Sequence, residues 1–336
     1  MSRLRIGLLG AGRIGSMHAE LIHNRVPDAE LVGVFDVMAE SAKRVGEAVG
    51  ATVFDSADEL ITASDVDAVA IATSTDTHVE MIMAAAGAGK AIFCEKPISL
   101  DLEQVDQALV AVDRAGVPLQ IGFNRRFDPG HAAVRQAVAD GTIGEVRQIR
   151  ITSRDPEPPP LSYIEVSGGI FNDMTIHDFD MARFITGSDV IEVWAKGDCR
   201  VDPAIGAAGD LDTVVAVLTH VDGTITTIDN CRQSAYGYDQ RVEAFGSLGM
   251  STSDNLLDHY TTNRTGDGGH SARVPHFFLD RYIPSYLAQW ASFVAAVDGG
   301  SEPVVTGADG RAPLVMAQAA WRSVREERAV PTNEFD

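Results

Sequence analysis

The sequence predicts an α/β protein of two domains, with a parallel sheet in the first and antiparallel strands in the second. Its 336 residues exceed what one core usually holds, because single hydrophobic cores stop growing near roughly 250 to 300 residues. Short apolar runs alternate with segments of helical periodicity over residues 1–123, which is typical of parallel strands linked by helices. Residues 124–336 contain strand-like alternation and a hairpin signal, so we place the domain boundary between 123 and 124.

The elements of the first domain follow from this alternation. Residues 4–9 form an almost continuous apolar run ending in glycines, as expected for a central strand that is buried on both faces. A helix should follow over residues 14–22, whose apolar members recur at helical spacing. The remaining strands are expected at 30–35, 68–72, 91–94 and 119–122, with helices at 38–49, 79–86 and 101–115.

The second domain is expected to combine one strongly periodic helix, entered from residues 168–177, with a sheet. Strands are predicted at 190–197, 213–219 and 224–229, and residues 220–223 mark a hairpin between the last two. The polar, glycine-containing stretch 253–275 is expected to be a loop, with His259 and His270 as loop residues rather than metal ligands. Helices at 286–297 and 311–324 should close the structure, with residues 306–309 as a start signal for the last.

Composition limits the partners and the compartment. The 27 Lys and Arg against 48 Asp and Glu give a net charge of −21, which disfavours nucleic acid and anionic membranes. No apolar stretch approaches the roughly 18 residues of a membrane span. The three cysteines lack metal or redox spacing, so reduced thiols and a cytoplasmic location are expected. We expect no metal.

A glycine motif predicts a nucleotide site at the end of the first strand. Gly10, Gly12 and Gly15, with Arg13 and Ile14 between them, form a GxGxxG turn between a strand and a helix. These glycines permit the turn, the approach of a pyrophosphate and close helix packing, and the helix N-terminus favours negative charge.

An acidic residue predicts which dinucleotide binds. Asp36 ends the second strand, where its carboxylate can bind both ribose hydroxyls and would repel a 2′-phosphate, so NAD is favoured over NADP. Thr73 and Ser74 follow the 68–72 strand at its carboxyl end and are expected to line the cofactor pocket. A methyltransferase, which also binds a nucleoside through a glycine loop and an acidic residue, is the alternative at this point.

A lysine follows the next strand. Glu95, Lys96 and Pro97 come directly after the strand 91–94, at the sheet edge where open α/β sheets bind ligands, so we expect them beside the cofactor. An ammonium at this edge can stabilise a developing alkoxide, which weighs against the methyltransferase. A surface lysine paired with Glu95 is the alternative.

Further polar residues are candidates for the substrate site. Asp173 and His177 are four residues apart, which in one helix places a carboxylate and an imidazole on the same face. A helix-surface ion pair or a satisfied core histidine is the alternative. The other substrate-binding candidates are Asn124 and Arg126 after the last strand of the first domain, Asp155 before a proline-rich loop, and Tyr236 as an aromatic contact. The alternatives are an ordinary solvent loop for Asp155, a buried sheet tyrosine for Tyr236 and a structural role for Arg126.

These motifs together resemble one family. The glycine loop, Glu95-Lys96-Pro97 and the GG…DMxxHDxD stretch of residues 168–180 are similar to those of the glucose–fructose oxidoreductase and inositol dehydrogenase (Gfo/Idh/MocA) family. The resemblance covers essentially the whole chain. It is closest to the inositol 2-dehydrogenases, because residues 153–156, the prolines up to 160, residues 167–169 and residues 236–241 also follow that pattern.

The resemblance implies the architecture and the catalytic group. It implies an N-terminal Rossmann domain and a C-terminal α+β domain whose open, mostly antiparallel sheet carries the substrate site on one face and an oligomer contact on the other. Homotetramers are common in the family. Lys96, Asp173 and His177 match its catalytic residues.

The expected reaction is oxidation of a cyclic polyol or sugar hydroxyl by NAD, most closely that of myo-inositol. Hydride transfer leaves a proton that a histidine can accept near neutral pH. We therefore expect His177 to be the base, Lys96 to donate a hydrogen bond to the emerging alkoxide, and Asp173 to orient a hydroxyl or the imidazole. Other inositols, aldoses and anhydrosugars are alternative substrates; an NAD-dependent glycosidase and a non-catalytic NAD-binding regulator are alternative functions.

Overall fold

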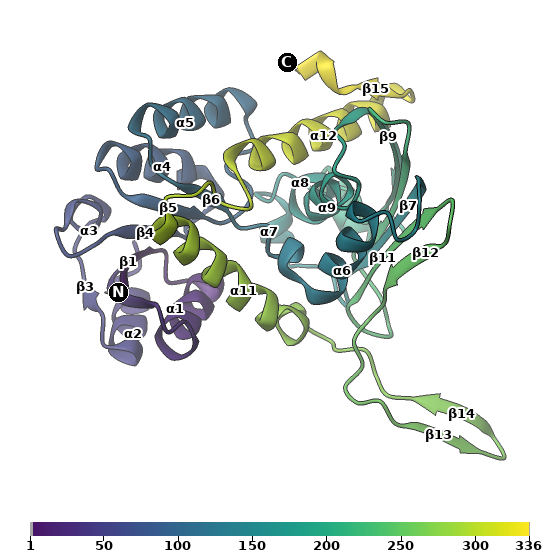
Figure 1. The fold of residues 1–336 in the computed structure, drawn as a ribbon, viewed down its shortest axis with the longest axis horizontal. Coiled ribbons are helices and arrows are strands. Elements are labelled where there is room, and N and C mark those ends of the chain that lie inside the picture. Colours follow the sequence, from purple (N-terminus) through teal and green to yellow (C-terminus); the bar gives the residue numbers. More distant parts are fainter. Residues whose placement is uncertain (1–2, 336) are drawn as a thin grey trace. The chain divides into compact units, whose positions relative to one another are not determined.

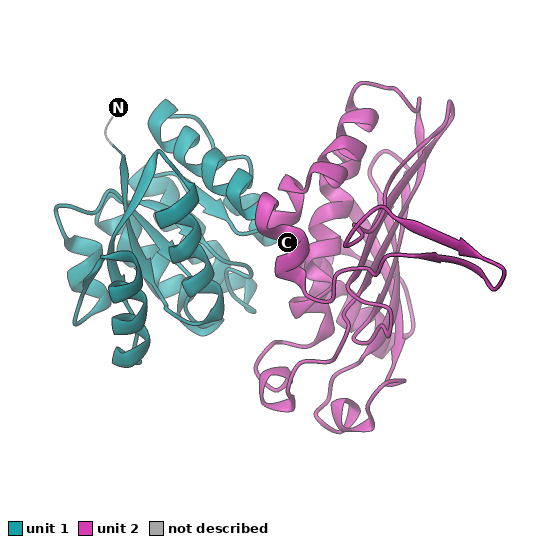
Figure 2. Cartoon of the chain, turned by 90° about the horizontal axis from the view of Figure 1, so that it is seen from below, with its two compact units in different colours: residues 1–123, 286–312 teal, residues 124–285, 313–336 magenta. Residues whose placement is uncertain are grey.

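The computed structural model describes residues 3–335 and divides them into two compact units. Unit 1 contains the described residues up to Phe123 together with Tyr286–Ala312, and unit 2 contains Asn124–Ser285 and Pro313 onward (Figure 2). One boundary between the units therefore lies between Phe123 and Asn124, where the domain boundary was expected. Residues 286–312 were expected in the second domain, and here the chain differs from the prediction.

Unit 1 is built on a parallel sheet of six strands (Figure 1). The strand order is β3-β2-β1-β4-β5-β6, and every neighbouring pair is parallel. This is the order of a dinucleotide-binding sheet, and it confirms the predicted fold class of this part of the chain. The strands are β1 (Leu4–Leu9), β2 (Ala29–Phe35), β3 (Thr52–Val53), β4 (Ala68–Ile71), β5 (Ala91–Cys94) and β6 (Leu119–Ile121).

Helices connect the strands of unit 1 close to the predicted positions. Asp101 caps the helix before β6, because its carboxylate accepts hydrogen bonds from the backbone of Glu103 and Gln104. The helices are α1 (Arg13–Arg25), α2 (Ala39–Val49), α3 (Ala57–Thr62), α4 (His78–Gly87) and α5 (Leu102–Ala115), with a short η1 (Thr75–Thr77) before α4.

The core of unit 1 explains why residues 286–312 belong to it. Helix α11 (Phe278–Gly299) places Trp290 and Phe293, both fully buried, against Phe93 of β5. Residue 305 also completes the sheet edge, since the carbonyl of Val305 accepts a hydrogen bond from the backbone of Ile121. Large aromatic side chains such as these bury much apolar area, so they hold α11 against the sheet of unit 1. The position of a helix along the sequence does not reveal which sheet it covers.

The second sheet has seven strands and is mixed. Its order is β12-β11-β7-β10-β9-β8-β15, and all neighbours are antiparallel except β7 and β10. The predicted, mostly antiparallel sheet and the hairpin at 220–223 are thereby confirmed. The strands are β7 (Val146–Arg154), β8 (Val190–Asp198), β9 (Thr213–His220), β10 (Ile225–Cys231), β11 (Asp239–Gly246), β12 (Met250–Ser253) and β15 (Val330–Pro331).

One face of this sheet is covered and the other is open. Buried and accessible residues alternate along β8 and β9, and the buried ones pack against Phe171, Phe179 and Met316 from the helices. The helices of unit 2 are α6 (Pro129–Ala139), α7 (Leu161–Ile164), α8 (Ile170–Asp173), α9 (Ile176–Thr186), α10 (Pro203–Ala207) and the part of α12 (Gly307–Glu326) from Pro313, with η2 (Asn124–Phe127) and η3 (Thr332–Phe335).

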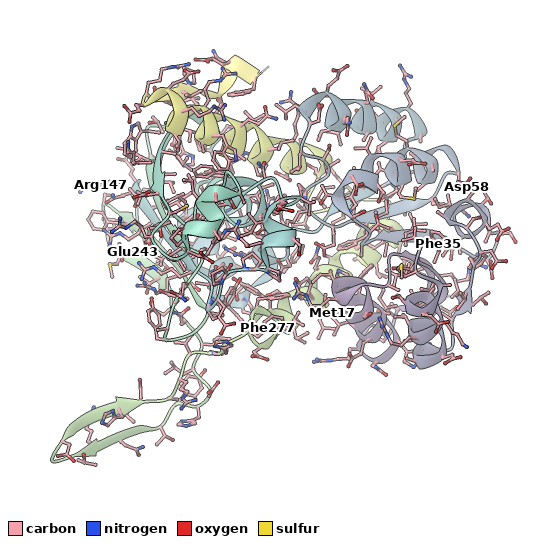
Figure 3. The ribbon with its side chains drawn as sticks, turned by 180° about the vertical axis from the view of Figure 1, so that it is seen from behind. Met17, Phe35, Asp58, Arg147, Glu243 and Phe277 are labelled. Carbon is pink, nitrogen blue, oxygen red and sulfur yellow. The ribbon has the colours of Figure 1, made fainter. Side chains whose placement is uncertain are left out.

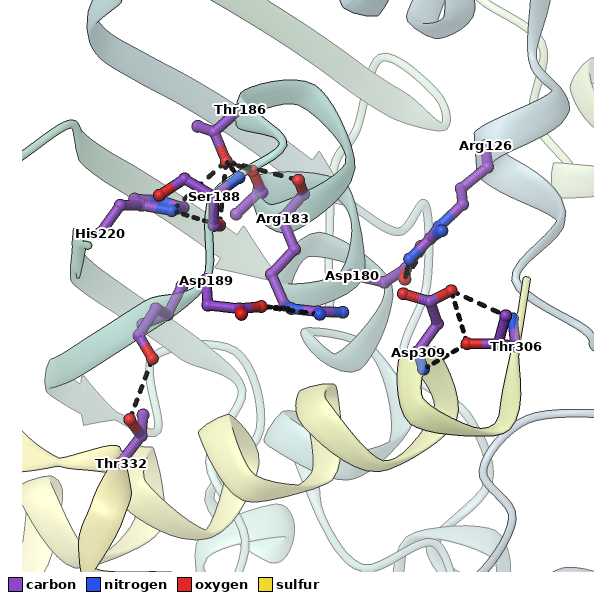
Figure 4. Close-up of polar contacts among 12 residues, drawn as sticks. Arg126, Asp180, Arg183, Thr186, Ser188, Asp189, His220, Thr306, Asp309 and Thr332 are labelled. Atoms are coloured by element: carbon purple, nitrogen blue, oxygen red, sulfur yellow. Dashed lines mark hydrogen bonds and ion pairs between the residues drawn. The ribbon is translucent and has the colours of Figure 1, made fainter. Parts of the chain in front are cut away.

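Helix α12 begins at the predicted start signal. The hydroxyl of Thr306 accepts a hydrogen bond from the backbone of Asp309, whose carboxylate accepts one in return from the backbone of Thr306 (Figure 4). Such a reciprocal pair satisfies donors that the first helical turn leaves without partners.

Residues 253–275 contain a feature that the sequence did not predict. They include a two-stranded antiparallel ribbon, β13 (Thr262–Thr265) and β14 (Gly268–Ser271), where a loop was expected. All eight residues are exposed, and the ribbon extends away from the seven-stranded sheet (Figures 1 and 3). A strand with no buried face has no alternation of apolar and polar residues, so the pattern gave no signal.

Within residues 3–335, no helix combines the length and apolar character that a membrane crossing needs.

Candidate active site

The glycine loop has the shape of a phosphate cradle. Gly10 has a φ of 95°, and a Cβ there would lie 2.5 Å from the carbonyl oxygen of Ala72. A Cβ at Gly15 would lie 1.9 Å from the carbonyl oxygen of Gly10, whereas one at Gly12 would meet no atom within 4 Å. The first and third glycines are therefore required by packing, and the second borders the open space that a pyrophosphate needs.

Asp36 follows Phe35, which ends β2, and its contact with Ala11 places it beside this cradle. Its carboxylate accepts hydrogen bonds from the backbone of Ala11, at 2.6 Å, and of Met38, at 2.7 Å. The glycine loop and the acidic residue are thus held together, and they fit the ribose and pyrophosphate of NAD. No sequence pattern indicated that Arg44 of α2 would reach the loop, where it donates to the carbonyl of Ala11 at 3.2 Å.

The ends of β4 and β5 are connected at the same sheet edge. The peptide bond between Lys96 and Pro97 is cis. His78, the first residue of α4, lies 2.8 Å from the carbonyl oxygen of Pro97 and 3.2 Å from that of Thr73. Burial lowers the pKa of His78, so the neutral ring donates its one N–H to one of these carbonyls. His78 thus lies between the predicted cofactor residues Thr73 and Pro97.

In unit 2, Asp173 is held by two side chains. The Tyr163 hydroxyl donates to one carboxylate oxygen at 2.9 Å, and the Arg232 guanidinium donates to the other at 3.0 Å. Arg232 is completely buried and also donates to Asp210 at 3.1 Å. Sequence reasoning missed Arg232 and Asp210, because the pair joins residues 22 positions apart and neither belongs to a recognisable motif.

Asp155 belongs to the same electrostatic group. Its pKa is raised to about 6, mainly by burial and also by the negative charge of Asp173, while Arg125 and Arg232 oppose the increase. Sites that transfer protons often contain two carboxylates in different environments. Here Asp173 has an arginine partner, whereas the pKa of Asp155 is raised.

Asp173 and His177 are the two accessible residues of this stretch. Both are half-buried, whereas all other residues from Gly169 to Ala182 are buried. The two residues do not lie in one continuous helix as predicted, because Asp173 ends α8 and His177 is the second residue of α9.

A buried network holds the start of α9. The Thr175 hydroxyl donates to Asn230 of β10 at 2.6 Å, and the Asn230 amide donates to Asp178 at 2.7 Å. Arg125 donates to the other oxygen of Asp178 at 2.7 Å, and Ser153 of β7 donates to it at 2.6 Å. The position of His177 is therefore fixed by the sheet on one side and by α8 on the other.

The remaining candidates have other surroundings. Arg126 donates to both carboxylate oxygens of Asp180, and both side chains are buried (Figure 4). Asn124 is buried at the start of η2. The Tyr236 hydroxyl contacts Asp239 and accepts from Arg154 at 2.9 Å. Arg154 follows Ser153 in β7, so it faces the side of the sheet opposite to the helices.

Comparison with known proteins agrees with the geometry. The parallel sheet, the open glycine cradle and the carboxylate after the second strand define a nucleotide-binding protein, and the family comparison gives its class as an oxidoreductase. Residues 4–123 match the model of the oxidoreductase family with an NAD-binding Rossmann fold, and residues 131–252 match the GFO/IDH/MocA C-terminal domain. The chain belongs to the Gfo/Idh/MocA oxidoreductase family.

Individual relatives are similar along their full length. The chain is 46% identical to a myo-inositol 2-dehydrogenase of Thermotoga maritima, over 98% of this chain and 99% of that protein. It is 47% identical to an inositol 2-dehydrogenase of Rhizobium meliloti, over 97% and 98%. A crystal structure of scyllo-inositol dehydrogenase from Lactobacillus casei with NAD(H) and scyllo-inositol matches with a TM-score of 0.92 and 29% identity, over 99% of this chain and all of that chain.

Proposed function

We propose that this chain is an NAD-dependent dehydrogenase that oxidises a secondary hydroxyl of a cyclic polyol, with myo-inositol and its 2-keto product as the substrate pair. The observation that carries the proposal is the NAD cradle formed by Gly12 and Asp36, in a chain that is 46–47% identical to inositol 2-dehydrogenases over nearly its whole length.

The proposed chemistry assigns a role to each catalytic candidate. NAD, when bound, supplies the acceptor for the hydride. His177 takes the hydroxyl proton, since an imidazole titrates near the working pH. Lys96 donates a hydrogen bond to the oxygen as its negative charge develops, and a donor that acts on the transition-state charge lowers the barrier. The proposal requires these groups to act on one substrate carbon.

The carboxylates of unit 2 are proposed to hold the ring. Asp173 keeps oxygen lone pairs for a substrate hydroxyl, while Arg232 compensates its charge. Asp155, with a pKa of about 6, can accept a hydrogen bond from a hydroxyl or, when protonated, donate one. We also propose Asn124 as a substrate contact. Arg126 and Tyr236, which the sequence suggested as substrate contacts, are proposed as positioning residues instead, because Arg126 is paired with Asp180 and the Tyr236 hydroxyl with Asp239.

A second inositol isomer is the other candidate substrate. The similarity to the Lactobacillus casei enzyme with bound scyllo-inositol supports it, at a lower identity than the myo-inositol relatives. Ring epimers differ only in the orientation of one hydroxyl, so the same set of carboxylates serves either.

We propose a homotetramer in the cytoplasm. The open face of the seven-stranded sheet carries exposed apolar side chains on neighbouring strands, among them Trp194, Val215 and Ile225, which a second copy of the chain would cover. All three cysteines are free thiols, as is usual in a reducing compartment. Sedimentation of the purified protein measures the assembly, and a monomer at micromolar concentration would contradict it.

The activity is tested by following NADH absorbance with myo-inositol, scyllo-inositol, other inositols, glucose, xylose and anhydrosugars, in parallel with NAD and NADP. We expect NAD reduction with myo-inositol at the highest kcat/KM. Preferred use of NADP would contradict the role of Asp36. Reduction of NAD with aldoses alone would contradict the proposal that the substrate is a cyclic polyol.

Replacing His177 by Ala tests the base. General-base catalysis contributes roughly 100-fold or more, so turnover should fall by at least about that factor. His259→Ala is the matched control, because His259 is exposed outside the site and its loss should leave turnover unchanged. Unchanged turnover in His177→Ala would refute the assignment.

A further inference from the structure

A buried hydrogen-bond chain in unit 1 ends at the residue before Lys96. His18 of α1 is completely buried, and its Nε2 lies 2.8 Å from a carboxylate oxygen of Glu95. The indole nitrogen of Trp290 in α11 donates to Nδ1 of the same ring at 3.0 Å. Three elements that are distant in the sequence therefore meet at one carboxylate.

The chemistry of the donors determines which atom donates at each step of this hydrogen-bond chain. An indole N–H only donates, so Nδ1 of His18 must be the acceptor and the ring proton of the neutral form lies on Nε2. His18 consequently donates to Glu95. The rings of Phe93, Tyr286 and Trp290 surround the imidazole edge-on, with centroids 5.3 to 5.5 Å away, and prevent it from turning.

Glu95 is confined on its other side as well. Its second carboxylate oxygen accepts from the backbone N–H of Lys96 at 3.3 Å. A Cβ on Gly122 would lie 2.8 Å from that oxygen, so the glycine after β6 leaves the space that the carboxylate fills. The orientation of Glu95 is thus coupled to the backbone from which Lys96 projects.

We propose that Trp290, His18 and Glu95 act as positioning residues that orient Lys96 and the nicotinamide end of NAD. This inference rests on the proposed function and deepens it. The helix that carries His18 begins at the glycine loop, so the chain of hydrogen bonds connects the phosphate cradle with the carboxyl end of β5. What separates His18 from an ordinary buried histidine is its acceptor: the Glu95 carboxylate also accepts from the backbone of Lys96, the proposed catalytic lysine.

Two substitutions at His18 separate positioning from packing. His18→Leu fills similar space without donor or acceptor. His18→Gln restores both functions, since an amide oxygen can accept from Trp290 and the amide N–H₂ can donate to Glu95. We expect kcat with myo-inositol to fall by about 10- to 100-fold in His18→Leu, as when a hydrogen bond to a charged group is lost, with KM for NAD changed by less than about threefold. His18→Gln should recover most of kcat.

A second set of measurements does not depend on turnover. Nitrogen-15 NMR of the histidine-labelled free enzyme should show His18 as the Nε2–H tautomer, with the signal assigned by its loss in His18→Gln. The fluorescence of bound NADH, which reports the surroundings of the nicotinamide, should change in His18→Leu at nearly unchanged affinity and return in His18→Gln. Melting temperatures of both variants show whether they fold.

The outcomes distinguish this inference from the proposed function. If the wild-type enzyme oxidised no polyol, the proposed function would fail, and the NADH fluorescence would still decide the role of His18. An Nδ1–H tautomer would overturn the inference. So would a folded His18→Leu variant with wild-type kcat and wild-type NADH fluorescence, or a His18→Gln variant as impaired as His18→Leu.

Discussion

At the scale of single residues, the site of unit 2 combines two carboxylates that lie in different environments. Asp173 is bound by the buried Arg232 and by the Tyr163 hydroxyl, whereas burial and the charge of Asp173 raise the pKa of Asp155 to about 6. A carboxyl group with a pKa of about 6 can exchange a proton near neutral pH, so Asp155 is the titrating member of this pair.

This difference predicts how stability depends on pH. Between pH 3.8, the ordinary value, and about 6, the folded state holds a proton on Asp155 that the unfolded state has lost, so Asp155 lowers the free energy of unfolding as pH rises through this window. The full effect is about 3 kcal/mol. In Asp155→Asn this loss is absent, and the variant should gain melting temperature relative to the wild type from pH 4 to pH 7. A melting-temperature difference between variant and wild type that stays constant from pH 4 to pH 7 would contradict the raised pKa of Asp155.

Most of the cofactor site could be predicted from the sequence, and much of the substrate site could not. The glycine loop and Asp36 follow the ends of neighbouring parallel strands, so their positions along the sequence were enough to predict that they meet. The partners of Asp173 depend on tertiary packing: Arg232 reaches it from the end of β10, and a buried arginine resembles a surface arginine in a single sequence. Contacts between distant segments are the information that local patterns lack.

At the scale of elements, the division between α8 and α9 is the feature that presents His177. The Thr175 hydroxyl, between the two helices, donates to Asn230 instead of to a helix carbonyl, and Asn230 in turn binds Asp178. Apolar residues keep helical spacing across the junction, which is why the sequence predicted one helix. The polar anchor at this junction joins distant segments of the chain, which periodicity does not reveal.

Thr175→Val tests this anchor, because valine keeps the shape and removes the hydroxyl. Asn230 would lose a buried donor, which costs about 1 to 3 kcal/mol. We expect a lower melting temperature and a several-fold lower kcat, with KM for NAD unchanged since the cradle lies in unit 1. Thr262→Val, in the exposed β13 strand, is the control and should alter neither value. A stable, fully active Thr175→Val enzyme would show that the anchor is dispensable.

At the scale of the whole molecule, unit 1 is discontinuous in the sequence. The last strand of its sheet ends at Ile121, yet its core includes Trp290, Phe293 and Val294, which follow the whole of Asn124–Ser285. The sequence predicted each of these elements but assigned the last ones to the wrong domain, because strand and helix patterns do not encode the sheet on which a helix packs.

Fragments of the chain test this division. A fragment of residues 1–123 should lack a cooperative thermal transition, because the buried side of β5 would face water. Residues 1–123 joined by a flexible linker to 286–312 should fold, and Trp290, the only tryptophan in this fragment, should show the blue-shifted fluorescence of a buried indole. An independently folded 1–123 fragment would contradict the division.

The late return of the chain to unit 1 also has a consequence at the ribosome. Domains usually fold in the order in which they are made, the N-terminal one first. Here the nascent nucleotide-binding sheet must wait, with Phe93 uncovered, until the helix that carries Trp290 has left the exit tunnel. Newly made chains should therefore acquire the ability to bind NAD only late in translation, and until then the uncovered apolar sheet is a natural substrate for chaperones.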